Sequence, residues 1–250
     1  MLIQSMTHSQ CPNTWQAAPA ELTLAPHQVH IWRQDLQISS IQLADDEQLL
    51  NTEELATANQ FIFAKHRRRY IAARAMLRKL LARYIAITPQ NLTFENNAYG
   101  KPQLIDVHNP AQLQFSVSHS HELACYAVTC QHTIGIDIEW IHPLDYLGLA
   151  ERFFANDEYQ ALAQLPTAQL ATGFFRVWTQ KEAFVKALGL GLQYPLDQFC
   201  VTTQPPANLI WLAQEDPQPW VMQALTIAPN YCAHLATPQP IHLYQGWQDA

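Results

Sequence analysis

One short segment, Ile134 to Glu139, constrains the fold of this chain more than any other. Isoleucines alternate in it with Gly135, Asp137 and Glu139. Strict alternation with β-branched residues predicts a strand whose side chains point to opposite faces in turn. We therefore expect both carboxylates on one face of a sheet and the isoleucines on the other.

Two interpretations of Asp137 and Glu139 follow from that placement. Neighbouring carboxylates repel unless a cation lies between them, and a divalent ion that prefers oxygen ligands, magnesium above all, fits there. The alternative is a solvent-facing strand that carries two acids by chance, because alternating apolar and acidic residues are common. The strand alone leaves both open.

Composition predicts a compact globular protein, since 48% of its 250 residues are hydrophobic and 14% charged. A net charge of −7 argues against bulk nucleic-acid binding. Nine of the fourteen Lys and Arg nevertheless lie between Lys65 and Lys101. A basic zone on an acidic protein indicates an anionic ligand held at one place.

The five cysteines are odd in number and include no Cys-x-x-Cys pair. This favours a reducing compartment, so we expect a cytoplasmic protein. No apolar run approaches ~18 residues, and no signal peptide is evident, so we expect no membrane association. Residues 1–25 are polar and contain several prolines, which predicts a loosely ordered N-terminal extension.

The order of predicted elements indicates an α+β fold made of two similar halves, residues 26–131 and 132–250. In the first half we expect a strand at 29–36, helices at 45–63 and 66–86, and a hairpin of strands at 113–118 and 123–129. In the second half we expect a strand at 134–139, helices at 147–154, 157–165 and 174–188, and strands at 199–202, 220–227 and 231–237. Gly189 is placed to cap the last of these helices.

The helix predicted over 174–188 carries Glu182 and Lys186 four residues apart, on one face. A solvated surface ion pair is the usual explanation of such spacing. The surrounding residues are apolar, however, and charges on such a helix are unfavourable unless they have a task. Glu182 is a candidate third carboxylate beside Asp137 and Glu139, with Lys186 addressing a phosphate.

The segment Ser116 to His121 follows a predicted strand and is dense in polar groups. His119 and His121 are weighed as zinc ligands, but no third ligand has convincing spacing. Ordinary loop histidines are the common alternative. A phosphate contact through Ser118 and His119 fits better with the neighbouring basic zone.

Several ordered motifs resemble one known family over roughly residues 28–240. They are Tyr99–Pro102, Val117–Ser120, Gly135–Glu139, Arg152–Phe154, Trp178–Lys186, Gly189–Leu192 and Pro195–Asp197. The set is similar to the surfactin-type 4′-phosphopantetheinyl transferases. Val29–Trp32 and Val117–Ala124 resemble the cyanobacterial, heterocyst-glycolipid type within that family.

The resemblance implies a pseudo-twofold pair of α+β halves with coenzyme A bound in the cleft between them. It assigns a magnesium ion, with manganese as an alternative, to Asp137, Glu139 and Glu182. It assigns the phosphates of coenzyme A to Lys186, Lys101, Ser118 and His119, and places Arg69 and Arg74 near the nucleotide end. Residues 55–60 lack the basic side chains of many relatives, so contacts to the 3′-phosphate are left to Arg67–Arg69.

The reaction that the resemblance implies moves phosphopantetheine from coenzyme A to a serine of an acyl or peptidyl carrier protein and releases 3′,5′-ADP. Glu182 is the candidate base, directly or through a metal-bound water, and Lys186 the second catalytic residue. Two fused halves make a monomer the expected state. Apolar contacts from Leu144, Tyr146, Leu147 or Leu149 are candidates for docking the carrier.

Two rival functions remain open. A metal-dependent phosphodiesterase or nuclease also uses acidic clusters with a lysine, although the acidic pI of about 5.8 counts against a nucleic-acid substrate. The other is a binder of coenzyme A or of carrier proteins that has lost turnover. The presence of all four residues, Asp137, Glu139, Glu182 and Lys186, speaks against such decay.

Overall fold

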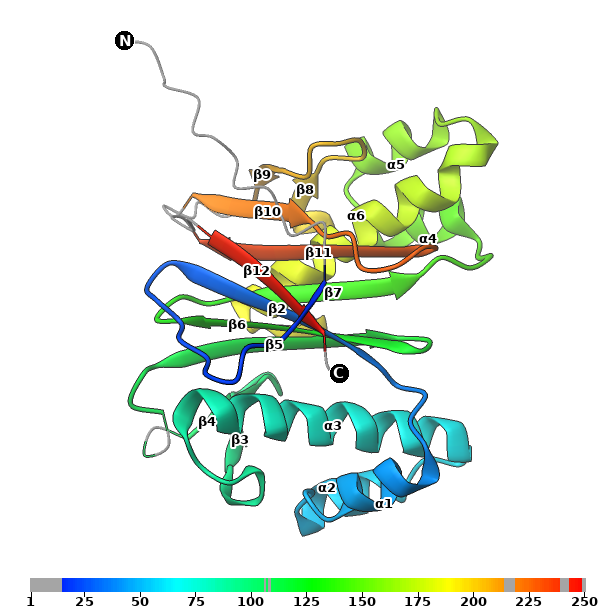
Figure 1. Cartoon of the computed structure of the whole chain (residues 1–250). Coiled ribbons are helices and arrows are strands. Elements are labelled where there is room, and N and C mark those ends of the chain that lie inside the picture. The colour runs from blue at the N-terminus through cyan, green and yellow to red at the C-terminus, as the bar shows by residue number, and fades with distance from the viewer. Residues whose placement is uncertain (1–14, 106, 108, 214–218, 239–242, 249–250) are drawn as a thin grey trace.

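The two larger sheets lie side by side in a computed structural model describing residues 15–105, 107, 109–213, 219–238 and 243–248 (Figure 1). The five-stranded sheet has the order β1 (Gln16–Ala17), β12 (Leu243–Gln248), β2 (Gln28–Asp35), β6 (Leu123–Cys130) and β5 (Leu113–Ser120). The three-stranded sheet has the order β10 (Trp220–Ala224), β11 (Tyr231–Pro238) and β7 (Gly135–Trp140). The sheets meet where β5 lies beside β7.

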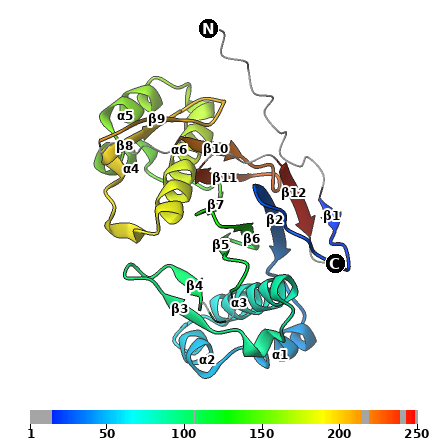
Figure 2. The ribbon, with the colours of Figure 1, turned by 90° about the vertical axis from the view of Figure 1, so that its left-hand side faces the viewer.

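Helices cover the two outer sides of this pair of sheets (Figure 2). The first half contributes α1 (Ser40–Glu47), α2 (Thr52–Ala58), α3 (Ala64–Ile85) and the small hairpin β3 (Phe94–Asn96) and β4 (Pro102–Leu104). The second half contributes α4 (Tyr146–Phe153), α5 (Asn156–Ala163), α6 (Thr167–Leu188), β8 (Phe199–Val201) and β9 (Leu209–Leu212). Each half thus has one 22-residue helix packed on a sheet, and the expected two-half α+β fold is confirmed.

Three larger apolar cores hold these layers together, and a smaller one lies between α3 and the short helices α1 and α2. One lies between α3 and the five-stranded sheet and includes Trp32 and Tyr126, and a second packs α6 against its sheet around Phe174 and Phe184. The third lies between the sheets and contains the isoleucines of 134–138, which are fully buried. The alternation predicted for this strand is confirmed, since its apolar face is enclosed. Among the described residues, no helix is both long and apolar enough to cross a membrane.

The helix predicted over 45–63 is wrong, because the structure has two short helices at its place. Ser39 caps α1, with its Oγ accepting from the backbone N–H of Gln42, so this helix begins earlier than expected. Asn51 caps α2 in the same way toward Glu54. A capping side chain of this kind satisfies the free N–H groups of a first turn, so the chain ends one helix and starts another there.

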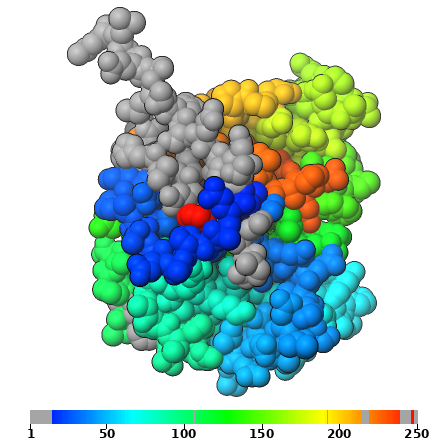
Figure 3. Space-filling model, in the orientation of Figure 1, coloured from blue at the N-terminus to red at the C-terminus, as the bar shows by residue number. Residues whose placement is uncertain are grey.

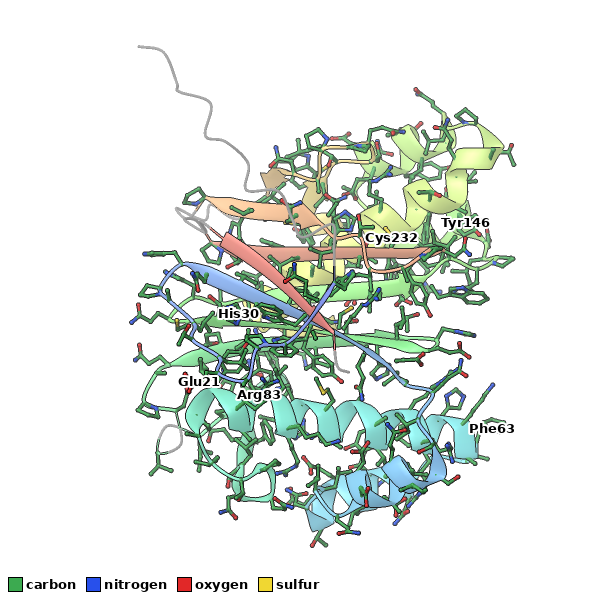
Figure 4. The ribbon with its side chains drawn as sticks, viewed as in Figure 1. Glu21, His30, Phe63, Arg83, Tyr146 and Cys232 are labelled. Atoms are coloured by element: carbon green, nitrogen blue, oxygen red, sulfur yellow. The ribbon has the colours of Figure 1, made fainter. Side chains whose placement is uncertain are left out.

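Residues 15–25, which belong to the expected N-terminal extension, make contacts with the rest of the protein, whereas residues 1–14 lie outside the described part. β1 pairs with β12, Leu22 and Leu24 pack on the first core, and Arg83 donates to the carbonyl of Pro19. Figure 3 shows this segment, in dark blue, lying across the surface, and Figure 4 shows Arg83 close to Glu21.

The last strand, β12, was not expected, and it crosses from the second half into the sheet of the first. It pairs in parallel with β2, which brings Trp247 opposite Trp32. The hairpin of β3 and β4 also reaches the other half, where Asn97 donates from Nδ2 to the carbonyl of Gly189. That glycine ends α6 in the left-handed conformation, as predicted. The pairing of β12 with β2 and the hydrogen bond of Asn97 thus connect the two halves in addition to the β5–β7 junction.

Candidate active site

The site is built on the face of β7 that looks toward α6. Asp137 and Glu139 lie on this face, opposite the buried isoleucines. Gly135 lies on it too, and a Cβ there would come within 1.9 Å of the carbonyl oxygen of Ala183 on α6. The absence of a side chain at Gly135 therefore lets the helix backbone approach the strand closely. This approach brings Glu182 and Lys186 to the two acids of β7.

Replacing Gly135 by alanine is expected to destabilise the protein by at least about 1–3 kcal/mol, because the new methyl meets backbone atoms that cannot rotate away. Urea unfolding followed by circular dichroism measures this loss. We expect the activity of the site to fall in the variant that remains folded, since Glu182 and Lys186 shift with the helix. An unchanged midpoint of unfolding would contradict the close contact of α6 with β7.

A pocket of ≈ 300 Å³ opens between these elements. It is lined by Val117, Ser118, His119, Asp137, Glu139, Trp178, Glu182 and Lys186. Six of these eight were predicted as site residues from the sequence. Trp178 was not, although it lies one helical turn before Glu182, a spacing that places both on the same face of α6.

The acids of the pocket are close enough to affect one another's ionisation. Burial, and then the charge of Asp137 and that of Glu139, raises the pKa of Glu182 to about 7. Burial also raises the pKa of Glu139, with a further contribution from Asp137, while the hydroxyl of Ser120 opposes the shift. Three carboxyl groups therefore share one partly desolvated space, and a cation among them would relieve their repulsion.

Asp137 is the most enclosed of the three acids. Its Oδ1 accepts from Lys186 Nζ at 2.7 Å and from Ser118 Oγ at 2.8 Å. Its Oδ2 is buried and has no hydrogen-bond partner in the described part of the chain. A buried carboxylate oxygen without a partner is unfavourable, so a ligand bound to this atom would be stabilising. Nearby, burial and then the charge of Lys186 lower the pKa of His119.

The carboxylates of the pocket are oxygen ligands of the kind that a magnesium ion requires. Within the described residues, no three His, Cys, Asp or Glu side chains already form a cluster able to hold a metal ion. Mg²⁺ does not need a closed protein cage, because it keeps several waters and binds through one or two carboxylates and substrate phosphates. With the unpartnered Oδ2 of Asp137, the pocket fits an ion that the protein holds jointly with a phosphate-bearing ligand. Waters and phosphate oxygens would fill the coordination positions that the carboxylates leave open.

Two other predicted cations, Arg69 and Lys101, are not among the residues that line the pocket. Arg69 approaches Glu122 at 3.8 Å, and its charge contributes to lowering the pKa of His119. Lys101 donates from Nζ to the carbonyl of Ile134 at 3.0 Å, just before β7. Burial lowers the pKa of this lysine to about 8.

Arg74, in contrast, is directed away from the pocket. It forms an ion pair with Glu54 on α2, and its guanidinium lies 4.2 Å from the ring centre of Phe94. Arg78 binds the same carboxylate at 2.7 Å. Arg74 and Arg78 therefore hold α2 against α3. At these two positions the basic side chains, which suggested a ligand-binding stripe, have a structural role.

The arginines considered for the 3′-phosphate also have partners within the protein. Arg67 binds Glu47 at 2.7 Å, and Arg68 donates to the carbonyl of Ile38 at 2.6 Å. Of the three, Arg69 has the longest contact and is the one beside His119. Among these predicted arginines it is therefore the best placed to serve a ligand in the cleft.

The residues weighed for zinc and for carrier docking have mixed outcomes. His121 stacks on Trp140 with 4.6 Å between ring centres, and it belongs to no metal-binding cluster among the described residues. Leu144 is exposed, whereas Tyr146 packs partly on the core of the second half, as do Leu147 and Leu149. Leu144 and Trp140 are thus the apolar side chains that a partner would meet first here.

Ser120 is a residue of the site that sequence reasoning missed. Its Oγ donates to Glu139 Oε2 at 2.6 Å, as Ser118 does to Asp137. The signal was available, because Ser116, Ser118 and Ser120 recur at the period of a strand and therefore share one face of β5.

Comparison with known proteins agrees with this geometry. Residues 133–236 match the profile of the 4′-phosphopantetheinyl transferase superfamily, and residues 35–131 match that of the 4′-phosphopantetheinyl transferase N-terminal region. The two matched ranges adjoin between residues 131 and 133.

Individual proteins similar to this chain indicate the same family. The chain is 43% identical to the 4′-phosphopantetheinyl transferase HetI of Nostoc sp. over 72% of this chain and 76% of that protein. It is 32% identical to psf-1 of Bacillus pumilus over 75% of this chain and 78% of that protein, and 26% identical to Sfp of Bacillus subtilis over 76% and 83%. A solved holo-[acyl-carrier-protein] synthase of Thermotoga maritima aligns with 43% of this chain and 62% of its own at TM-score 0.36 and 18% identity, a likeness from which nothing further follows. Taken with the pocket on β7 and α6, the matches show that the chain belongs to the 4′-phosphopantetheinyl transferase superfamily, whose members transfer phosphopantetheine to carrier proteins.

Proposed function

We propose that this enzyme takes phosphopantetheine from coenzyme A, uses Mg²⁺, and releases 3′,5′-ADP as it modifies a carrier serine. The observation that carries the proposal is the pocket in which Asp137, Glu139 and Glu182 converge while a buried oxygen of Asp137 has no partner. Mn²⁺ is the alternative ion, because it accepts the same oxygen ligands.

Each pocket residue has a part in this proposal. When bound, Mg²⁺ would neutralise charge that builds on the pyrophosphate oxygens. Lys186, held against Asp137, brings a fixed positive charge to the same oxygens. Glu182 comes from α6, the element facing the two acids of β7, and we assign it as the base that accepts the proton of the carrier serine. His119, Arg69 and Lys101 contact the phosphates of coenzyme A, with Ser118 beside them.

Binding of coenzyme A at pH 8 is expected to take up about half a proton through Lys101, because a lysine with a pKa of about 8 is half neutral there and a phosphate favours its charged form. Calorimetric titration in two buffers of different ionisation enthalpy measures this uptake. Lys101→Arg is the control, since arginine is always charged and uptake at this position should vanish. Equal heats in both buffers for the unaltered protein would contradict a phosphate contact by Lys101.

The transfer itself is tested by incubating the protein with coenzyme A and an apo carrier and following both products by chromatography. Equal amounts of holo carrier and 3′,5′-ADP are expected. Nucleotide release without carrier would favour the phosphodiesterase alternative, and coenzyme A binding without either product would favour a binder that has lost turnover.

We further propose that the protein is a monomer of the cytoplasm. The two fused halves supply both sides of the pocket from one chain, and the described cysteines, Cys125, Cys130, Cys200 and Cys232, form no disulfides. Light scattering after size-exclusion chromatography tests the oligomeric state, with the mass of one chain as the expected result.

A further inference from the structure

Three serines connect the two sheets at the junction of β5 and β7. The oxygens of Ser116, Ser118 and Ser120 accept the backbone N–H groups of Ile136, Ile138 and Trp140 at 3.0, 3.3 and 3.0 Å. In the described structure, β5 and β7 share no backbone ladder, so these hydroxyls take the place of the carbonyls of a neighbouring strand. On both strands every second residue takes part in these hydrogen bonds.

Two of the three hydroxyls have a second contact. Each serine hydroxyl has one proton to donate, and Ser118 gives its proton to Asp137 Oδ1 while Ser120 gives its proton to Glu139 Oε2. Every carboxylate that β7 offers to the pocket is thus held by the serine across the junction. Ser116 lies opposite Ile136 and Gly135, neither of which has a carboxylate. Within the described residues, its hydroxyl therefore makes only the hydrogen bond to Ile136 that joins the strands.

The contact of Ser120 fixes a side chain that would otherwise be free to rotate. Glu139 lies near the end of β7, and its side chain has more rotatable bonds than that of Asp137. No lysine or arginine within the described residues forms an ion pair with it. A hydrogen bond at 2.6 Å to one oxygen selects a rotamer and leaves the other oxygen for a ligand.

We infer that Ser120 is a positioning residue for Glu139, aligning this carboxylate for the cation of the pocket. The inference rests on the proposed function, in which Glu139 is a magnesium ligand. Ser118 has the same relation to Asp137, but it also lines the pocket and can meet coenzyme A. Ser120 does not line it, so the role of Ser120 can be tested without altering the surface that the substrate contacts.

The test is the affinity of the full-length protein for Mg²⁺, measured by isothermal titration calorimetry with coenzyme A bound and no carrier present. We expect Ser120→Ala to weaken binding by about tenfold or more, the range usual when a partner of a metal ligand is removed. Ser116→Ala is the matched control, because it loses the same kind of strand-joining bond without touching a carboxylate. It should lower the melting temperature and leave Mg²⁺ affinity unchanged.

A second pair of variants separates the hydroxyl from the fold. Ser120→Thr and Ser120→Val have the same shape and similar preference for strands, and only threonine keeps the hydroxyl. Threonine should restore Mg²⁺ affinity and valine should not. Equal affinity in the valine variant, or an equal loss in Ser116→Ala, would overturn the role of Ser120 while leaving the metal site intact. Failure of the unaltered protein to bind Mg²⁺ would overturn the metal site as well.

Discussion

Replacing Glu182 by glutamine is expected to reduce turnover by about 10²-fold or more and to leave coenzyme A bound. Glutamine keeps the shape of the side chain but cannot accept a proton from the carrier serine. It also removes the partial negative charge that Glu182 carries near pH 7, so repulsion toward the phosphates of coenzyme A does not increase. The rate of holo-carrier formation and calorimetric titration of coenzyme A measure the two properties separately.

The control for this exchange is Glu151→Gln on α4, where the glutamate is exposed. That variant should behave as the unaltered enzyme does. Unchanged turnover in Glu182→Gln would exclude Glu182 as the base. Loss of coenzyme A binding together with turnover would also contradict the assignment, since it would place the effect in substrate binding.

Replacing Lys181 by methionine is expected to lower the free energy of unfolding by about 3–5 kcal/mol, the usual effect of leaving one charge of a buried pair without its partner. Lys181 Nζ lies 2.8 Å from Glu158 Oε2, and both side chains are fully buried. The same ammonium donates to the carbonyl of Leu196 at 2.7 Å and to that of Phe199. Its loss would therefore leave the buried carboxylate of Glu158 without its cation, with only the backbone N–H groups of Ala155 and Val201 as donors, and would remove a donor from two carbonyls in the core of the second half.

Urea unfolding at pH 7 measures this effect. Lys65→Met is the control, because Lys65 is exposed at the start of α3 and the same change of residue should alter stability little. A loss below about 1 kcal/mol for Lys181→Met, the range of surface ion pairs, would contradict the account of this pair as a structural element of the motif that also carries Glu182.

Much of the site was predictable from the sequence because its signals are local. The alternation around Asp137 and Glu139 sets their common face within one strand, and helical spacing does the same for Glu182 and Lys186. Such patterns depend on the period of an element and survive any arrangement of the rest of the chain. Their convergence in one pocket was a hypothesis that needed Gly135 and the close packing of α6.

The features that sequence reasoning missed depend on partners far away in the chain. Arg74 has the same helical spacing whether it faces a ligand or Glu54, and only packing decides between them. The strand β12 joins β2 across more than two hundred residues, and no local pattern indicates that pairing. Ser120 needed its register against β7 before its contact with Glu139, 19 residues later in the chain, could be recognised.

The mass of an apo carrier protein after incubation with this enzyme tests the central claim most directly. With coenzyme A and Mg²⁺ present, the carrier should gain the mass of one phosphopantetheine group on a single serine. Chelation of the ion should abolish the gain, and fresh Mg²⁺ should restore it. A carrier that stays unmodified with all components present, or that is modified equally well under chelation, would contradict the account.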